Sequence, residues 1–280
     1  MIRSLARSKV VLISAVFLVL LVLIAAFGPL VYPVDPAAQD VDNLRNYPTL
    51  THLLGTDDRG RDTLARLMIG MRVSLIVAVV VEAFNIIVGA GLGVLAGYFG
   101  GLIDILVSRI ADMLFAFPGL LLAILISAIF GSAVGEFAGG IGRLLLVSFS
   151  LALVGWPLMA RYTRGQTLAL RERLFIEGTR ALGADDRHIL LHHIVPNLAG
   201  LIIVGATLDV ASVIVSEATL GLLGLSAQNP QTSLGKMIVE AFGYITLNWT
   251  QVLFPSLVLA LFVLALSFVG DGLQEYVEHS

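Results

Sequence analysis

Six long apolar stretches alternate with polar connections along the chain. A bilayer core about 30 Å thick requires roughly 20 mostly apolar helical residues, because backbone groups without a hydrogen-bond partner are costly in lipid. Each stretch is bounded by Gly, Pro or charged residues. The stretches cover residues 10–31, 73–98, 102–130, 144–162, 198–225 and 252–269. This pattern predicts an all-α membrane protein with six transmembrane helices.

Basic residues near the stretches predict the orientation. Arg3, Arg7 and Lys9 precede the first stretch, whose apolar run is too long for a typical signal peptide and therefore predicts an uncleaved anchor that begins in the cytoplasm. Segment 161–197 carries six Arg, whereas the five Arg of the outward segment 32–72 are offset by six Asp. An excess of basic residues marks cytoplasmic connections, so we expect both termini to be cytoplasmic.

The chain divides into three parts. Residues 1–72 comprise an N-terminal cytoplasmic segment, the first transmembrane helix and an outer loop. Residues 73–275 form a five-helix core with a cytoplasmic loop at 163–197, and residues 276–280 form a cytoplasmic tail. The longest polar stretch has about 40 residues, which is too short for an ordinary independent core. We therefore expect no soluble domain.

Composition agrees with a membrane protein and excludes other classes. Hydrophobic residues make up 58% of the chain and charged residues 13%, and the mean hydropathy is +0.94. The absence of cysteine excludes disulfides and thiolate metal sites. The net charge is -3, and the 17 Lys and Arg form no single basic surface, so we expect no nucleic-acid partner.

The cytoplasmic loop is far longer than a connection between adjacent spans requires, which indicates a function. Residues 167–182 lack Pro and are rich in Leu, Ala, Arg and Glu, so they should form a helix that Gly183 stops. Asp185 or Asp186 can cap a second short helix, and Pro196 should close the segment before the fifth span. This projecting knob could transmit force to or from a soluble partner.

Two runs within this loop carry a family resemblance. The sequence FIEGTRALGA at 175–184, followed by HIVPN at 193–197, resembles the EAA loop of binding-protein-dependent ABC importer permeases. The dipeptide, oligopeptide and nickel branch of that family is indicated by further similar runs, which are LGTDDRGRD at 54–62, AGYFGG at 96–101, FP at 117–118, GWP at 155–157, EA at 217–218, LLGL at 222–225 and GDGL at 270–273. The resemblance covers about residues 1–275.

The resemblance implies a type I ABC importer permease fold in a bacterial or archaeal cell membrane. It also implies a second homologous permease subunit, one or two ATPase subunits that use ATP and Mg, and a substrate-binding protein outside the membrane. This chain should contain no cofactor and should not hydrolyse ATP, since Gly235-Lys236 lacks the remaining residues of a phosphate-binding loop. Solute would pass inward by alternating access.

The same resemblance selects candidate site residues. For coupling to the ATPase we select Glu177 to stabilise the loop, Gly183 to permit the turn, and Asp185 and Asp186 to cap the short helix, together with Ala184. For contact with the incoming binding protein, the candidates are Asp57, Asp58 and Asp62. The alternative of a cation loop at 54–62 is disfavoured because the ligand set of an EF-hand is incomplete.

Ionisable residues within the predicted spans are costly and need an explanation. They are Glu82, Asp104, Arg109, Asp112, Asp209 and Glu217. Arg109 and Asp112 are spaced to neutralise each other on one helix. We favour structural pairing for the set, with contact to solute or gating as the alternative, for which Asp209 and Glu217 are the best candidates.

Two further patterns have a structural and a functional interpretation. Gly89, Gly93 and Gly97 form a smooth stripe on the second span, which favours close helix packing over a role in lining a solute path. His188 and His192 share a helical face near His193, but no third metal ligand is evident, so we expect a helix surface and no metal site.

Alternatives of other classes remain at this stage. A secondary transporter or channel would use the intramembrane acids as an ion relay, but paired repeats and broken-helix symmetry are missing. A membrane scaffold would recruit a soluble partner through the loop without transport. For an importer, dipeptides or oligopeptides are the expected solutes, and nickel, glutathione-like compounds, sugars or other small solutes are alternatives.

Overall fold

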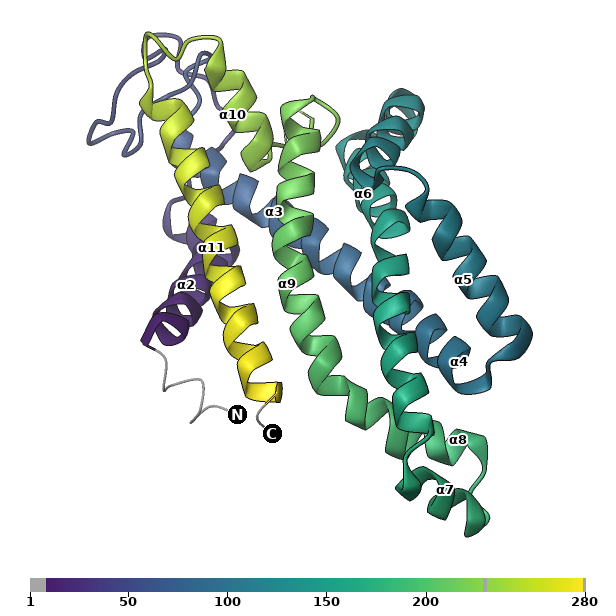
Figure 1. Ribbon diagram of the computed structural model, residues 1–280. Coiled ribbons are helices and arrows are strands. Elements are labelled where there is room, and N and C mark those ends of the chain that lie inside the picture. Colours follow the sequence, from purple (N-terminus) through teal and green to yellow (C-terminus); the bar gives the residue numbers. More distant parts are fainter. Residues whose placement is uncertain (1–8, 229–230, 279–280) are drawn as a thin grey trace.

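The computed structural model describes residues 9–228 and 231–278. All regular elements in these ranges are helices (Figure 1). The α-helices are α2 (Lys9–Val31), α3 (Thr63–Phe84), α4 (Gly91–Phe99), α5 (Gly101–Phe115), α6 (Gly119–Arg171), α7 (Leu174–Ala181), α8 (Asp186–Ile189), α9 (Val195–Leu222), α10 (Leu234–Phe242) and α11 (Thr250–Glu278). Two π-helices, η1 (Asn85–Ala90) and η2 (Leu190–Ile194), join α3 to α4 and α8 to α9.

The predicted N-terminal residues 1–8, including Arg3 and Arg7, lie outside the described residues, as do the last two residues of the predicted tail 276–280. The remaining elements can be compared directly with the six predicted spans.

Five helices in the described ranges are long and apolar enough to cross a membrane. The longest, α6, reverses its direction at Gly139, whose φ of 60° and ψ of -149° are not helical. Ser127 and Ser150, 23 residues apart, consequently meet across its two arms at 3.4 Å. The second arm supplies the predicted span 144–162. The first arm and α5, separated by a break before Pro118, supply the predicted span 102–130.

The glycine stripe packs against α6. A Cβ on Gly89 would lie 2.6 Å from the carbonyl oxygen of Trp156, and one on Gly97 would lie 2.7 Å from that of Arg164. Between them, a Cβ on Gly93 would collide with Thr163. Only bare backbone fits at this distance, so helix packing within the subunit, as predicted from the sequence, is confirmed.

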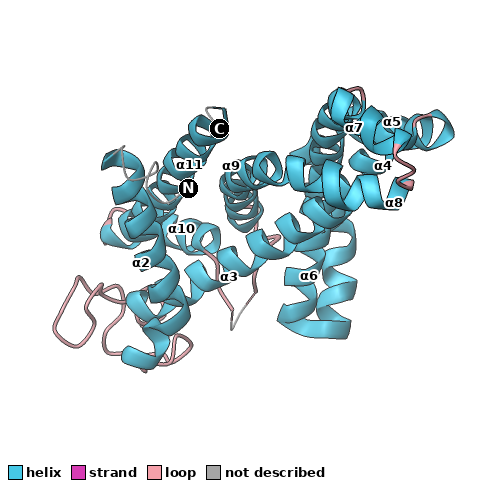
Figure 2. Cartoon of the chain, turned by 90° about the horizontal axis from the view of Figure 1, so that it is seen from below, coloured by secondary structure: helices cyan, strands magenta, loops and turns pink. Residues whose placement is uncertain are grey.

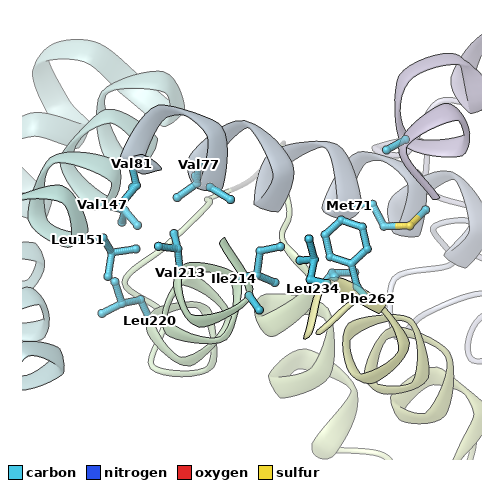
Figure 3. Packing of buried hydrophobic residues seen from close by; sticks show 14 of the residues in the cluster. Met71, Val77, Val81, Val147, Leu151, Val213, Ile214, Leu220, Leu234 and Phe262 are labelled. Atoms are coloured by element: carbon cyan, nitrogen blue, oxygen red, sulfur yellow. The ribbon is translucent and has the colours of Figure 1, made fainter. Parts of the chain in front are cut away.

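The hydrophobic core lies where α3 crosses the other long helices. Figure 3 shows Val77 and Val81 of α3 facing Val147 of α6 and Ile214 of α9. Towards the start of α3, the core continues to Phe262 of α11. Many residues on the outer surfaces of these helices are large, apolar and exposed, as is expected where a helix meets lipid or another subunit.

Different elements lie at the two ends of the molecule. Loop 32–62 and α10 lie together at one end, whereas α7 and α8 lie at the other, where α2 begins and α11 ends (Figure 1). The view from below shows α7 and α8 beside α4 and α5 and away from α2 (Figure 2). Loop 163–197 thus lies at the end where α2 begins and α11 ends, and its placement in the cytoplasm stays a prediction.

Candidate functional site

The loop at 163–197 contains two short helices joined by a glycine turn. Gly183 has a φ of 86°, a conformation that favours glycine, and follows the end of α7 as predicted. Asp185 caps α8 by accepting a hydrogen bond from the backbone nitrogen of His188 at 2.9 Å. These two predictions of local structure are confirmed.

The predicted continuous helix over 167–182 is wrong at Glu172 and Arg173. There α6 ends and a turn precedes α7, with the backbone nitrogen of Arg173 donating to the carbonyl of Leu170 at 3.1 Å. The break reorients the chain so that Ile176 becomes completely buried. Helix propensity alone favoured continuation, but burial of an apolar side chain contributes more than the few tenths of a kcal/mol that separate ordinary residues in propensity.

A small hydrophobic cluster attaches α7 and α8 to the membrane core. Ile176 of α7 and Ile189 of α8 are fully buried and pack with Val94 and Tyr98 of α4 and with Leu198 in the first turn of α9. Each fully buried Ile contributes about 1.5–3 kcal/mol relative to exposure. The two helices are therefore held on the transmembrane helices as one unit.

Tyr98 adds polar contacts to this attachment. Its hydroxyl donates to Asp186 Oδ1 at 2.7 Å and accepts from Arg180 Nη2 at 3.2 Å, so α4 is linked to both short helices. The guanidinium of Arg171 donates to the Tyr98 carbonyl at 3.0 Å. Sequence reasoning missed Tyr98 because its partners lie 82 and 88 residues away along the chain.

The outer surface of this unit is open. Glu177, Gly183, Asp185 and Asp186 are exposed, and Ala184 is half-buried against the hydrophobic cluster. The five residues selected from the sequence thus lie within α7, α8 and the turn that joins them, and Asp186 is bound to α4 through Tyr98. Their role in coupling stays a prediction.

The predicted boundary at Pro196 is wrong. The helical path runs from Asp186 through η2 and α9 to Leu222 without interruption. Pro196 occupies the first turn of α9, where its missing N–H removes no hydrogen bond that α9 itself requires. The extra residue in the turn of the preceding π-helix η2 leaves room for the proline ring. Any displacement of α8 can therefore be carried directly into α9.

The histidines form a packed surface on this helical path. The rings of His188 and His192 stack with their centroids 4.4 Å apart, and the ring of His193 lies 5.6 Å from that of His188. Among residues 9–228 and 231–278, no group of three or more His, Cys, Asp or Glu side chains is arranged to hold a metal ion.

A network of charged residues closes the opposite end of the molecule. Asp57 accepts from Arg61 Nε at 2.7 Å and from the guanidinium of Arg66. Both guanidinium groups also reach Glu240 of α10, at 3.2 Å from Arg61 and 2.6 Å from Arg66. Asp57, Arg61 and Arg66 are buried, which strengthens the network and fixes α10 to the start of α3.

The three acids proposed for binding-protein contact have different environments. Asp57 is enclosed in the charged network, and Asp62 caps α3 through Ala65 and accepts from Tyr32, with exposures of 3% and 1%. Both carboxylates are turned inward. Asp58 keeps 33% of its side chain exposed and is the member of the set that can meet a partner in this conformation.

The acids of α5 are paired, but with different residues from those predicted. Asp104 accepts from Arg164 Nη2 at 2.7 Å, and Asp112 accepts from Arg161 Nη2 at 2.8 Å. The expected pair of Arg109 with Asp112 is therefore wrong. The long arginine side chains of α6 reach across the helix interface, and such bidentate or charge-assisted contacts compete well with a pair on one helix.

Glu217 is fully buried where α9 meets α3. Its carboxylate accepts from Ser74 Oγ of α3 at 2.7 Å and from Ser226 Oγ in the connection to α10. The side chain therefore joins three segments through hydrogen bonds that satisfy a buried polar group. Its gating role stays a prediction.

Asp209 lies in a second polar cluster near the midpoint of α9. Asn85, the first residue of η1, donates through Nδ2 to Asp209 Oδ2 at 3.1 Å and to Glu82 Oε2 at 3.4 Å. Asp209 also lines two cavities, one of about 100 Å³ beside Gly155 and one of about 520 Å³ between α6, α9 and α11. Of the two predicted pathway residues, Asp209 is thus the one that lines open space.

Comparison with known sequences identifies the family. Residues 89–280 match the family described as binding-protein-dependent transport system inner membrane component, and residues 1–48 match the N-terminal transmembrane domain of oligopeptide transport permease C. The glutathione transport system permease proteins GsiD of Escherichia coli O157:H7 and of Shigella sonnei are each 38% identical over 281 residues, covering 99% of this chain and 88% of theirs.

A solved structure shares the fold. The match is to a chain of the MetNI methionine ABC transporter in an inward-facing conformation, with a TM-score of 0.59 and 24% identity, covering 76% of this chain and 96% of that chain. In this family the permease works with a binding protein and with a separate subunit that contains the ATPase activity. The chain belongs to the binding-protein-dependent transport system inner membrane components and is the permease subunit of an ABC importer.

Proposed function

We propose that this permease imports dipeptides or oligopeptides. The support is its similarity to glutathione permeases over nearly the whole chain and to the N-terminal domain of an oligopeptide permease. Glutathione is itself a small peptide, so both comparisons indicate the same chemical class of solute. A soluble binding protein outside the membrane would deliver the peptide.

The coupling surface is the observation that carries the proposed mechanism. Glu177, Gly183, Ala184, Asp185 and Asp186 belong to α7, α8 and the turn between them, a unit that is bound to α4 and continuous with α9. We infer that an ATPase subunit holds this unit. When two ATPase subunits close on ATP and Mg, the unit moves with them and turns α4 and α9, which alternates access to the pathway.

The assembly would contain a second homologous permease and one or two ATPase subunits. Both termini and loop 163–197 would face the cytoplasm, and α10 with loop 32–62 would face the binding protein. At that outer end Asp58 is the acid proposed to contact the binding protein, because Asp57 and Asp62 are engaged inside the loop. Asp209 and Glu217 are proposed to act in the pathway or its gate.

The test uses the complete complex in vesicles, with peptide uptake and ATP hydrolysis measured together. Replacing Glu177 by Arg reverses one charge on the exposed coupling face, so we expect ATP hydrolysis to persist while uptake falls by about tenfold or more. Glu172→Arg makes the same charge change at the nearby helix break and serves as the matched control. Omission of the binding protein should abolish uptake for every variant.

Two results would contradict the proposal. Peptide uptake without any ATPase subunit would identify an ATPase-independent transporter. Equal uptake by the wild-type and Glu177→Arg complexes, with the same number of peptides per ATP, would remove the coupling role of this face.

A further inference from the structure

The polar cluster around Asp209 contains more acceptors than donors. Oε1 of Glu82 and Oδ1 of Asn85 are buried without a hydrogen-bond partner, and the two residues are 5% and 0% exposed. Buried acceptors without a partner are costly and rare in folded proteins, so two in one cluster indicate that a donor is missing.

The cluster also has unbalanced charge. Glu82 and Asp209 share a single amide donor, so their carboxylates lie no more than two hydrogen-bond lengths apart. In the part of the chain that the structure describes, neither acid forms an ion pair, whereas Asp104 and Asp112 of α5 each pair with an Arg. Two neighbouring carboxylates in a membrane attract a cation or a proton.

Asp209 is the member of the cluster that reaches open space. Asp209 and Ser212 line both the cavity of about 100 Å³ and the cavity of about 520 Å³. The amide of Asn85 faces Gly155, where a Cβ would lie only 2.6 Å from Nδ2. The bare glycine leaves room for the amide beside the smaller cavity, and the larger cavity gives a solute access to Asp209.

We propose that Glu82, Asn85 and Asp209 form a binding site for the primary ammonium group of a solute. An ammonium group has three N–H donors and no acceptor. The site offers two unpartnered acceptors, Glu82 Oε1 and Asn85 Oδ1, beside the Asp209 carboxylate, and two acids with no basic partner give it a net negative charge. The apolar wall of the larger cavity, which includes Met159 and Leu208, would accommodate the rest of the solute.

This inference rests on the proposed function, because the amino terminus of a peptide is an ammonium group. A free peptide would bind through its amino terminus near the midpoint of α9 after leaving the binding protein. Acetylation of that terminus removes the charge and two of the three donors, so it should remove most of the affinity.

The experiment uses the purified permease–ATPase complex without the soluble binding protein. Binding of Ala-Ala and of N-acetyl-Ala-Ala is measured by saturation-transfer NMR, and ATP hydrolysis is measured in parallel. We expect Ala-Ala to bind about tenfold more tightly than its acetylated form, and Asp209→Asn to remove that difference. The control Asp112→Asn, the same change at a paired acid, should leave the preference intact.

Glu82→Gln is the second variant, used if Asp209→Asn does not assemble, and the same loss of preference is expected. Equal binding of the two dipeptides to the wild-type complex, no binding of either, or an unchanged preference in both variants would overturn the proposal. Stoichiometric Ca²⁺ binding that requires Asp209, without dipeptide binding, would identify a metal site and would also overturn it.

Failure of this site is distinguishable from failure of the proposed function. If the complete complex imports Ala-Ala at the expense of ATP but shows no ammonium preference, only the site is refuted. If the complex with its binding protein imports no peptide, the proposed peptide class is refuted.

Discussion

Replacing Tyr98 by Phe should loosen the coupling unit without disturbing its hydrophobic packing. The hydroxyl makes two hydrogen bonds to charged groups, one to Asp186 and one from Arg180. Such bonds contribute about 1.5–3 kcal/mol each when they are buried. Both partners are exposed here, and water replaces part of what is lost, so the expected total is about 1–2 kcal/mol.

This energy predicts a measurable change in local opening. A loss of about 1–2 kcal/mol changes the ratio of attached to detached unit by a factor of about 5–30. Amide hydrogen exchange in α7 and α8 should therefore accelerate by that factor in the complex without nucleotide. Exchange in α11 should not change, because α11 lies away from the unit.

The control for Tyr98→Phe is Tyr47→Phe. The hydroxyl of Tyr47 donates to the carbonyl of Leu247 at 3.2 Å at the opposite end of the molecule, so the same chemical change should leave α7 and α8 unaffected. A looser unit should also lower the number of peptides imported per ATP. Unchanged exchange in Tyr98→Phe, or equal acceleration in both variants, would refute the assignment of Tyr98 as the polar link.

Three further changes test other parts of the structure. Gly93→Ala places a Cβ against Thr163 and should destabilise the complex by about 1–3 kcal/mol in thermal unfolding, whereas Gly165→Ala, which meets no neighbour within 4 Å, should not destabilise it. Glu217→Ala leaves two serine hydroxyls unpaired and should reduce assembled complex by size-exclusion chromatography, while Glu217→Gln retains most of it; normal assembly of the Ala variant with a changed solute range would contradict this. Burial lowers the pKa of Lys236 from 10.5 to about 8, so the folded state binds fewer protons than the unfolded state between these values, and stability should rise with pH across that window. Lys236→Met should abolish the rise, and an identical pH profile for both proteins would contradict the assignment.

The elements that depend on local sequence could be predicted. Apolar length identified the spans, because lipid allows few alternatives to a helix. The stop at Gly183 and the cap at Asp185 follow from backbone freedom and from one side-chain oxygen, which act within three residues. The glycine stripe identified a close helix contact but could not name α6 as its partner.

Features that depend on distant partners could not be predicted. The sequence does not show that Arg161, 49 residues from Asp112, outcompetes the nearer Arg109. The inward turn of Asp57 likewise follows from its pair with Arg66, which Glu240 of α10 joins only in the folded chain. The break before α7 has the same kind of cause, since tertiary burial of Ile176 overrides local propensity.

The charged network that joins loop 32–62 to α10 also constrains how the protein is made. Arg66 and its partner Glu240 are 174 residues apart in the chain. At a synthesis rate of roughly 5–20 residues per second, Arg66 emerges on the order of ten seconds or more before Glu240 exists. During that interval Arg61 and Arg66 have Asp57 as a partner but lack the Glu240 carboxylate that later joins them. The arrival of α10 is therefore a late step of biogenesis, and in a chain interrupted before α10 Arg61 and Arg66 would keep Asp57 as a partner but lack Glu240, which fixes α10 to the start of α3.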